Sequence, residues 1–200
     1  MVEAAGRQVA IGCCDHTGWA VLVTVAGDAA RPQIVDRRRV ELVDPSLPRQ
    51  AYHAAVGLPL PDAGRLITEV EASALAVTAA QLATLRAELT DLGTEVVGIA
   101  VADAAQVPDD LAVVLARHPL LHAGEAALYR DALVEAACAT DLAVTRFAHG
   151  DAIGQAAVAL GVGRDELDGR LIELRRDLGA PWSADHRHAA AAALLALPST

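Results

Sequence analysis

The amino-acid sequence predicts an α/β protein in which a five-stranded mixed sheet carries helices on both faces. First, the apolar run 8–14 has no polar alternation, which is typical of a strand buried on both sides. Second, a short polar turn separates it from another apolar run at 19–25, as in a hairpin. Third, a long helical pattern at 62–92 is followed by apolar runs at 95–102 and 142–147 with helical patterns between and after them. This order makes a three-stranded meander followed by two parallel strands.

The size of the chain predicts one domain over residues 1–200, because no flexible or strongly charged linker divides it. Its apolar stretches are interrupted well short of a membrane span, and the first residues lack the apolar core of a signal peptide. The three cysteines are too few for a disulfide framework. We therefore expect a cytoplasmic protein with reduced thiols and no membrane contact.

The formal net charge is −10, and all 16 basic residues are arginines. Broad electrostatic binding of nucleic acid needs a basic face, so this balance argues against it, although a local arginine patch stays open. Hydrophobic residues make up 54% of the chain and aromatic residues only 2%. The core is therefore built from Ala, Val and Leu, and its alanine-rich helices can pack closely on one another or on a partner subunit.

The third strand is expected at 33–43, with Arg37, Arg38 and Arg39 at its centre. Three charges in a row are typical of an edge strand that is protected from pairing with another sheet. A stripe that binds phosphates is the alternative. The edge interpretation is favoured because it needs no partner.

Four prolines in 44–61 predict a long loop, whose Tyr52-His53 pair either lines a site or packs against the body of the protein. The strongest helix follows, with Asp62 as its expected N-cap and Gly93 at its end. Its length allows a kink or a division near Thr78.

The second half of the chain alternates helices with the last two strands. A short helix is expected from Pro108 to Arg117 and a longer one from His122 to Thr140. A helical insertion at about 151–180 has its turn at 161–163. The last helix starts near Ser183, a favoured N-cap, and ends before Pro198.

Acidic residues follow the buried strands where those strands end. Asp15 lies at the tip of the first strand and Asp103 at the tip of the fourth, and these two strands are expected to be adjacent and parallel, which brings both acids to one edge. Asp185 and His188 are three residues apart and share a face in the first turns of the last helix. Three carboxylates and an imidazole in one cleft would repel one another unless a cation bound them, and oxygen-rich sets suit Mg²⁺ or Mn²⁺.

The order of elements and these residues resemble the ribonuclease H-like superfamily, and within it the RuvC-type Holliday-junction resolvases. The residues that carry the resemblance are Asp15 in the run 12–20, Asp103 after Val101-Ala102, and Asp185 with His188 in the run 185–189. The resemblance implies that Asp15, Asp103 and Asp185 hold divalent metals. His188 would be a further ligand or would orient the attacking water.

A second group of candidate ligands is His118, His122 and Glu125. His122 and Glu125 share one helix face, whereas Pro119 is expected to prevent a continuous helix from His118. If this helix starts at the same edge as Asp103, Glu125 supplements or replaces Asp103 as a metal ligand. Helix capping or a solvated charge is the alternative for Glu125, and it is the favoured interpretation.

The stretch 156–174 resembles a helix-turn-helix, but its second helix carries Asp165, Glu166 and Asp168, which would oppose DNA phosphates. An ordinary helical hairpin or a dimer surface is the favoured interpretation. Phosphate-binding Gly-rich loops, nucleophile elbows and Cys-x-x-Cys pairs are absent from the sequence, which argues against nucleotide kinases, serine hydrolases and thiol redox enzymes.

Two functions from different classes follow. In the first, the protein is a nuclease or phosphodiesterase, a hydrolase that uses Mg²⁺ or Mn²⁺ on structured DNA or RNA. In the second, a non-catalytic chain keeps the ribonuclease H-like fold and acts as an oligomeric or protein-interaction module, such as a homodimer. The acidic positions favour the enzyme, and the net acidity favours the interaction module.

Overall fold

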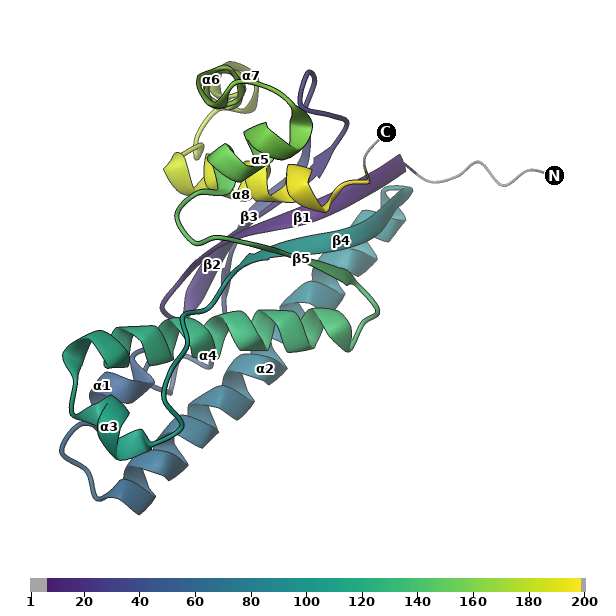
Figure 1. Ribbon diagram of the computed structural model, residues 1–200. Helices are drawn as coiled ribbons and strands as arrows, with labels where there is room; N and C mark the ends of the chain where they lie inside the picture. Colours follow the sequence, from purple (N-terminus) through teal and green to yellow (C-terminus); the bar gives the residue numbers. More distant parts are fainter. Residues whose placement is uncertain (1–6, 199–200) are drawn as a thin grey trace.

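The computed structural model describes residues 7–198, and a five-stranded mixed sheet forms its centre (Figure 1). The strand order is β3-β2-β1-β4-β5, with β1 antiparallel to β2 and parallel to β4. This order confirms the predicted meander and the central place of the first strand. The strands are β1 (Arg7–His16), β2 (Trp19–Ala26), β3 (Gln33–Glu41), β4 (Thr94–Ala102) and β5 (Ala143–Phe147).

Helices cover both faces of the sheet, as Figure 1 shows. One face carries α2 (Leu60–Asp91) and α4 (His118–Cys138), and the short helices α1 (Ala51–Ala55) and α3 (Leu111–Leu115) lie beside the beginning of α4. The other face carries α8 (Ala184–Ala196), with α5 (Ala152–Leu160), α6 (Arg164–Glu173) and α7 (Arg175–Leu178) on the same side. The sheet thus separates two apolar layers.

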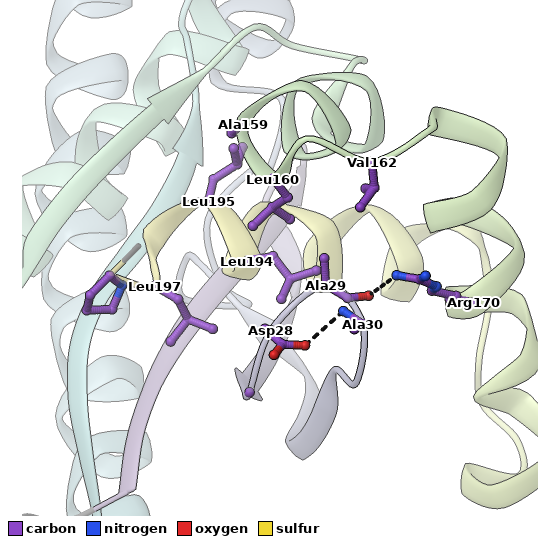
Figure 2. A pocket seen from close by; sticks show the side chains of 12 residues that line it. Asp28, Ala29, Ala30, Ala159, Leu160, Val162, Arg170, Leu194, Leu195 and Leu197 are labelled. Carbon is purple, nitrogen blue, oxygen red and sulfur yellow. Dashed lines mark hydrogen bonds between the residues drawn. The ribbon is translucent and has the colours of Figure 1, made fainter. Parts of the chain in front are cut away.

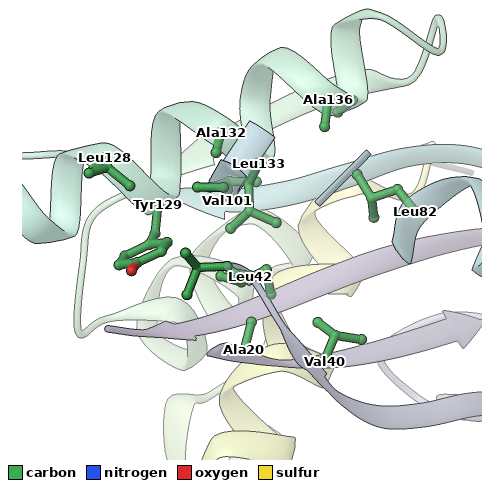
Figure 3. Close-up of a cluster of buried hydrophobic side chains, with 14 of the residues drawn as sticks. Ala20, Val40, Leu42, Leu82, Val101, Leu128, Tyr129, Ala132, Leu133 and Ala136 are labelled. Atoms are coloured by element: carbon green, nitrogen blue, oxygen red, sulfur yellow. The ribbon is translucent and has the colours of Figure 1, made fainter. Parts of the chain in front are cut away.

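The layer under α2 and α4 is held by a stripe of buried side chains on each helix. Figure 3 shows Tyr129 and Leu133 of α4 directed toward Leu42 and Val101, and Leu82 of α2 belongs to the same buried cluster. Burying an aliphatic side chain of this size contributes about 1.5–3 kcal/mol, so this layer is a main source of stability. By length and composition alone α2 is also apolar enough to cross a membrane, as the core helices of many water-soluble proteins are.

The layer under α8 depends on small residues. A Cβ atom on Gly12 of β1 would lie 1.8 Å from the carbonyl oxygen of Ala189 and 2.4 Å from the amide nitrogen of Ala193. Both alanines are fully buried. The alanine-rich helix therefore lies directly on the backbone of β1, which fixes its first turn against the end of that strand.

Prolines account for most differences from the predicted helix boundaries. Pro61 lies in the first turn of α2 and Pro119 in the first turn of α4, where a missing N–H removes no helical hydrogen bond. The prediction that Pro119 prevents a helix from His118 is therefore wrong, as is the prediction that α2 starts at Asp62. The helix α2 also continues without a break through Thr78.

Two short helices also depart from the predicted boundaries. The helix α1 lies inside the stretch 44–61, which was expected to be a loop. The helix α3 starts after Asp110, whose carboxylate accepts a hydrogen bond from the amide of Ala112 and so caps it, rather than at Pro108.

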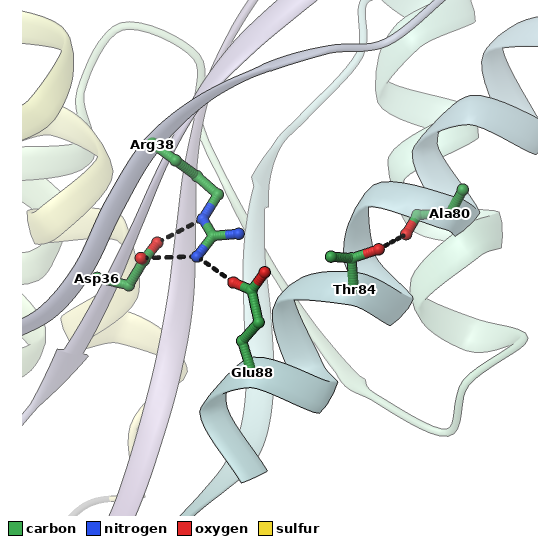
Figure 4. Close-up of polar contacts among 5 residues, drawn as sticks. All are labelled: Asp36, Arg38, Ala80, Thr84 and Glu88. Carbon is green, nitrogen blue, oxygen red and sulfur yellow. Dashed lines mark hydrogen bonds and ion pairs between the residues drawn. The ribbon is translucent and has the colours of Figure 1, made fainter. Parts of the chain in front are cut away.

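The arginines of β3 protect an edge of the sheet. Arg38 binds Asp36 of its own strand and Glu88 of α2, each at 2.7 Å (Figure 4). Arg37 donates to the carbonyl oxygens of residues 178, 179 and 181, and the Arg39 guanidinium lies 4.1 Å from the ring centroid of Trp19. All three are engaged within the molecule, in agreement with the edge interpretation.

Candidate site at the end of strand β1

The alternation of β1 sends neighbouring residues to opposite faces of the sheet. Asp15 contacts Arg130 of α4, whereas Cys14 and His16 contact Asp185 at the start of α8. The carboxyl end of β1 therefore carries two polar clusters, one on each face. The predicted residues Asp15 and Asp185 belong to different clusters.

The first cluster is a buried ion pair. Asp15 Oδ2 accepts a hydrogen bond of 2.8 Å from Arg130 Nε, and the two side chains are 6% and 5% exposed. The same guanidinium donates to the backbone carbonyl of Asp103 at 2.8 Å and to His149 Nδ1 at 2.7 Å. Arg130 thus joins the ends of β1 and β4 and supplies the positive charge that the sequence analysis assigned to a metal ion.

Asp103 follows β4, as predicted, but its side chain does not join Asp15 and Arg130. Its carboxylate is 58% exposed and accepts from Arg146 Nε at 3.2 Å. Asp103 and Asp15 are linked through the Asp103 carbonyl and Arg130. Their carboxylates are each bound to a separate arginine.

The second cluster contains Cys14, His16 and Asp185. The Cys14 thiol lies 3.9 Å from Asp185 Oδ1, and His16 Nε2 lies 3.3 Å from Asp185 Oδ2. One potential ligand atom from each residue lies within 4.8 Å of the others. Burial, together with the negative charge of Asp185, raises the pKa of the Cys14 thiol to about 12, so the thiol is neutral at pH 7.

His188 lies between the two clusters. With Cys14, Asp15 and His149 it lines a cavity of about 60 Å³ at the end of β1. This volume is enough for about two water molecules, each of which takes up roughly 30 Å³ in the liquid.

The predicted ligand Glu125 faces α1. Its Oε1 lies 2.8 Å from His53 Nδ1, and its side chain is 1% exposed. Of the five predicted site residues, the structure places Asp15 and His188 around one cavity and Asp185 beside Cys14. Asp103 and Glu125 direct their side chains to other partners.

These residues do not fit Mg²⁺ or Mn²⁺ well. Both ions prefer carboxylate, carbonyl and water oxygens, whereas Cys14 and His16 offer sulfur and nitrogen beside a single carboxylate. The carboxylate of Asp15, which would be the strongest oxygen ligand of β1, is neutralised by Arg130. The donor set of the second cluster is closer to what transition metals prefer.

Four residues of the two clusters were not predicted from the sequence as part of a site: Cys14, His16, Arg130 and His149. The period of two along β1 carries a usable signal, since the residues that face α8 alternate with those that face α4. The sequence pattern gave no indication that Arg130 is buried, because an arginine in an amphipathic helix is ordinarily solvated.

A separate groove of about 430 Å³ lies between the turn after β2, helix α5 and the end of α8 (Figure 2). Leu160, Leu194 and Leu197 line it. Its two charged residues have partners within the protein: Asp28 accepts from the amides that follow it, and Arg170 donates to the Ala29 carbonyl at 2.8 Å.

The sheet order and the placement of α8 against β1 define a ribonuclease H-like fold. Among solved structures, this chain is similar to RuvC of Thermus thermophilus, alone and in complex with a Holliday junction substrate. Both matches have a TM-score of 0.54 and 15% sequence identity, and cover 94% of this chain and 91% of RuvC. No family model and no curated protein matches the chain by sequence. The likeness confirms the RuvC-like architecture that the sequence predicted.

Proposed function

We propose that this protein is a non-catalytic member of the ribonuclease H-like fold that acts as a homo-oligomeric interaction module. The buried pair between Asp15 and Arg130 is the observation that carries the proposal. A carboxylate matched by a guanidinium inside the protein gains little from a divalent cation, which would first have to displace that partner.

The arginines support a function other than DNA binding. Many of them are already bound to carboxylates, so they are less available to displace counterions from a phosphate backbone. The ion-paired arginines are Arg38, Arg39, Arg49, Arg65, Arg130, Arg146, Arg164, Arg170 and Arg187. Together with the net charge of −10, this pairing favours a protein partner.

The surface proposed for self-association is the turn between α1 and α2. Val56, Leu58 and Leu60 are all exposed there within five residues of sequence. Apolar side chains gathered in this way are typical of protein contacts. A second copy of the chain would remove them from water.

Light scattering coupled to size-exclusion chromatography tests the proposal. We expect a concentration-dependent dimer that Leu58→Glu converts to a monomer. The matched control is Leu92→Glu, an exposed leucine after the far end of α2, which should leave the dimer intact. A monomer at all concentrations, or a dimer that both substitutions leave unchanged, would contradict the proposed module.

One observation favours the nuclease as a second candidate, namely the likeness of the whole fold to that of RuvC. A four-way DNA junction incubated with Mg²⁺ or Mn²⁺ separates the two candidates, since the similar RuvC is described with a Holliday junction. We expect the junction to stay intact. Metal-dependent cleavage that disappears with Asp185→Asn would favour the second candidate over the first.

A further inference from the structure

We infer that His53, His118 and His122 form a binding site for a transition-metal ion such as Zn²⁺, and that Glu125 orients His53 within it. His53 comes from α1, and His118 and His122 lie one turn apart at the start of α4. The helix beginning at His118 creates this pair, since residues four apart share a helix face. This site lies at the junction of α1 with α4, apart from the clusters at the end of β1.

The spacing of the three imidazoles suits one small ion. Their ring centroids are 4.6, 4.7 and 5.3 Å apart, and one ring nitrogen from each lies within 4.8 Å of the others. Tetrahedral zinc with bonds of 2.0–2.1 Å holds its nitrogen ligands about 3.4 Å apart. Because His118 and His122 are exposed, small side-chain rotations are enough to reach this spacing.

Glu125 provides independent support for a cation. Its Oε1 binds His53 Nδ1 at 2.8 Å, which leaves Nε2 of that ring for a metal. A ligand histidine held by a carboxylate through its other nitrogen is the usual arrangement in zinc sites. The second oxygen of Glu125 is buried and has no hydrogen-bond partner among the described residues.

The electrostatics also favour an added positive charge. A buried carboxylate with one unpartnered oxygen is costly, and a divalent ion on His53 would offset its charge. The N-terminus of α4 opposes a cation, but its partial charge is only about half a unit. The full negative charge of Glu125 is the larger of the two.

Packing holds the two helices in the arrangement that the site needs. A Cβ on Gly124 would lie 2.8 Å from the ring of Tyr52, so this glycine lets α1 lie close against α4. The Tyr129 hydroxyl donates to the Arg49 carbonyl at 2.7 Å and fixes the chain just before α1. His53 is therefore positioned by the scaffold, and the two exposed histidines adapt to it.

Isothermal titration of ZnCl₂ into the full, tag-free chain tests this inference. We expect one ion per protein at this site, accompanied by a rise in the melting temperature of about 5 °C at saturating metal. The double variant His118→Ala and His122→Ala should abolish this binding, and Glu125→Gln should weaken it about tenfold or more. Cys14→Ser is the matched control, because it removes a ligand from the other cluster and should leave the affinity unchanged.

Two outcomes would overturn the inference. One is the absence of zinc binding to the wild-type protein. The other is zinc binding whose stoichiometry and affinity are the same in the double histidine variant as in the wild type, or a loss of the His53 site's binding with Cys14→Ser. Because His118 and His122 are exposed, their replacement should leave the fold intact, which circular dichroism of the metal-free protein verifies. The test therefore does not depend on the buried Glu125.

Discussion

The chemistry at the end of β1 is decided by the face to which each residue points. Asp15 has the residue type expected of a metal ligand, yet it faces α4 and is bound by Arg130. Cys14, one position earlier, faces Asp185. The sequence placed Asp15 at the end of the first strand, where the structure has it. The partner of Asp15 could not be predicted, because it depends on how α4 packs across the sheet.

Replacing Arg130 tests the importance of the buried pair. Arg130→Gln leaves the Asp15 carboxylate buried without a full countercharge, and we expect the free energy of unfolding to fall by about 3–5 kcal/mol. Urea denaturation measures this change. The control is Arg146→Gln, which breaks the exposed pair with Asp103 and should cost under about 1 kcal/mol. Equal effects of the two substitutions would show that the buried pair has no special role.

His186 makes the stability of the folded protein depend on pH, and its surroundings determine the direction of this dependence. Burial, assisted by the positive charge of Arg37 and opposed by Asp185, lowers the pKa of His186 below its usual 6.5. The backbone N–H of Ser183 donates to its Nδ1, which also favours the neutral ring. The unfolded chain therefore takes up the proton first as the pH falls. The contribution of His186 to the free energy of unfolding is fully present above pH 6.5 and decreases as the pH falls below that value.

Thermal melting of the wild type and His186→Gln between pH 8 and pH 5 checks this prediction. The difference in melting temperature in favour of the wild type should shrink as the pH falls below 6.5. A difference that stays constant over the whole range would mean that His186 binds protons equally well in both states.

At the scale of single elements, apolar periodicity predicted the strands and the long helices. Several of the helix boundaries that were predicted from the positions of prolines were wrong. Pro119 was expected to delay α4 until His122, but its position in the first turn keeps His118 in the helix. The consequence for function is direct, because the three-histidine cluster exists only with that extra turn. The helix α1 was missed because five residues between prolines carry too little pattern.

The contact of α8 with β1 depends on a single glycine. We expect Gly12→Ala to destabilise the protein by about 3 kcal/mol or more, because its methyl group would overlap the backbone of α8 at Ala189. The control is Gly169→Ala in α6, where a methyl group meets open space and alanine is the better helix former. Chemical denaturation of both variants provides the comparison. Similar stabilities would contradict the close packing of α8 on β1.

At the scale of the whole molecule, the sheet order 3-2-1-4-5 and the two helical layers were predictable, since they follow from the order of apolar runs along the chain. The fold alone does not determine function, because the same architecture accommodates different sites. Here the fold resembles that of RuvC, and the end of β1 carries a carboxylate that is bound to a guanidinium, in the buried pair of Asp15 with Arg130. The proposal of an interaction module rests on this buried pair.

A titration of Mg²⁺ and Mn²⁺ followed by thermal melting tests most directly whether Arg130 has taken the place of a metal ion at Asp15. With the charge of Asp15 already matched, we predict that neither ion raises the melting temperature of the wild type more than that of Asp15→Asn. A rise of several degrees in the wild type that Asp15→Asn removes would contradict this account.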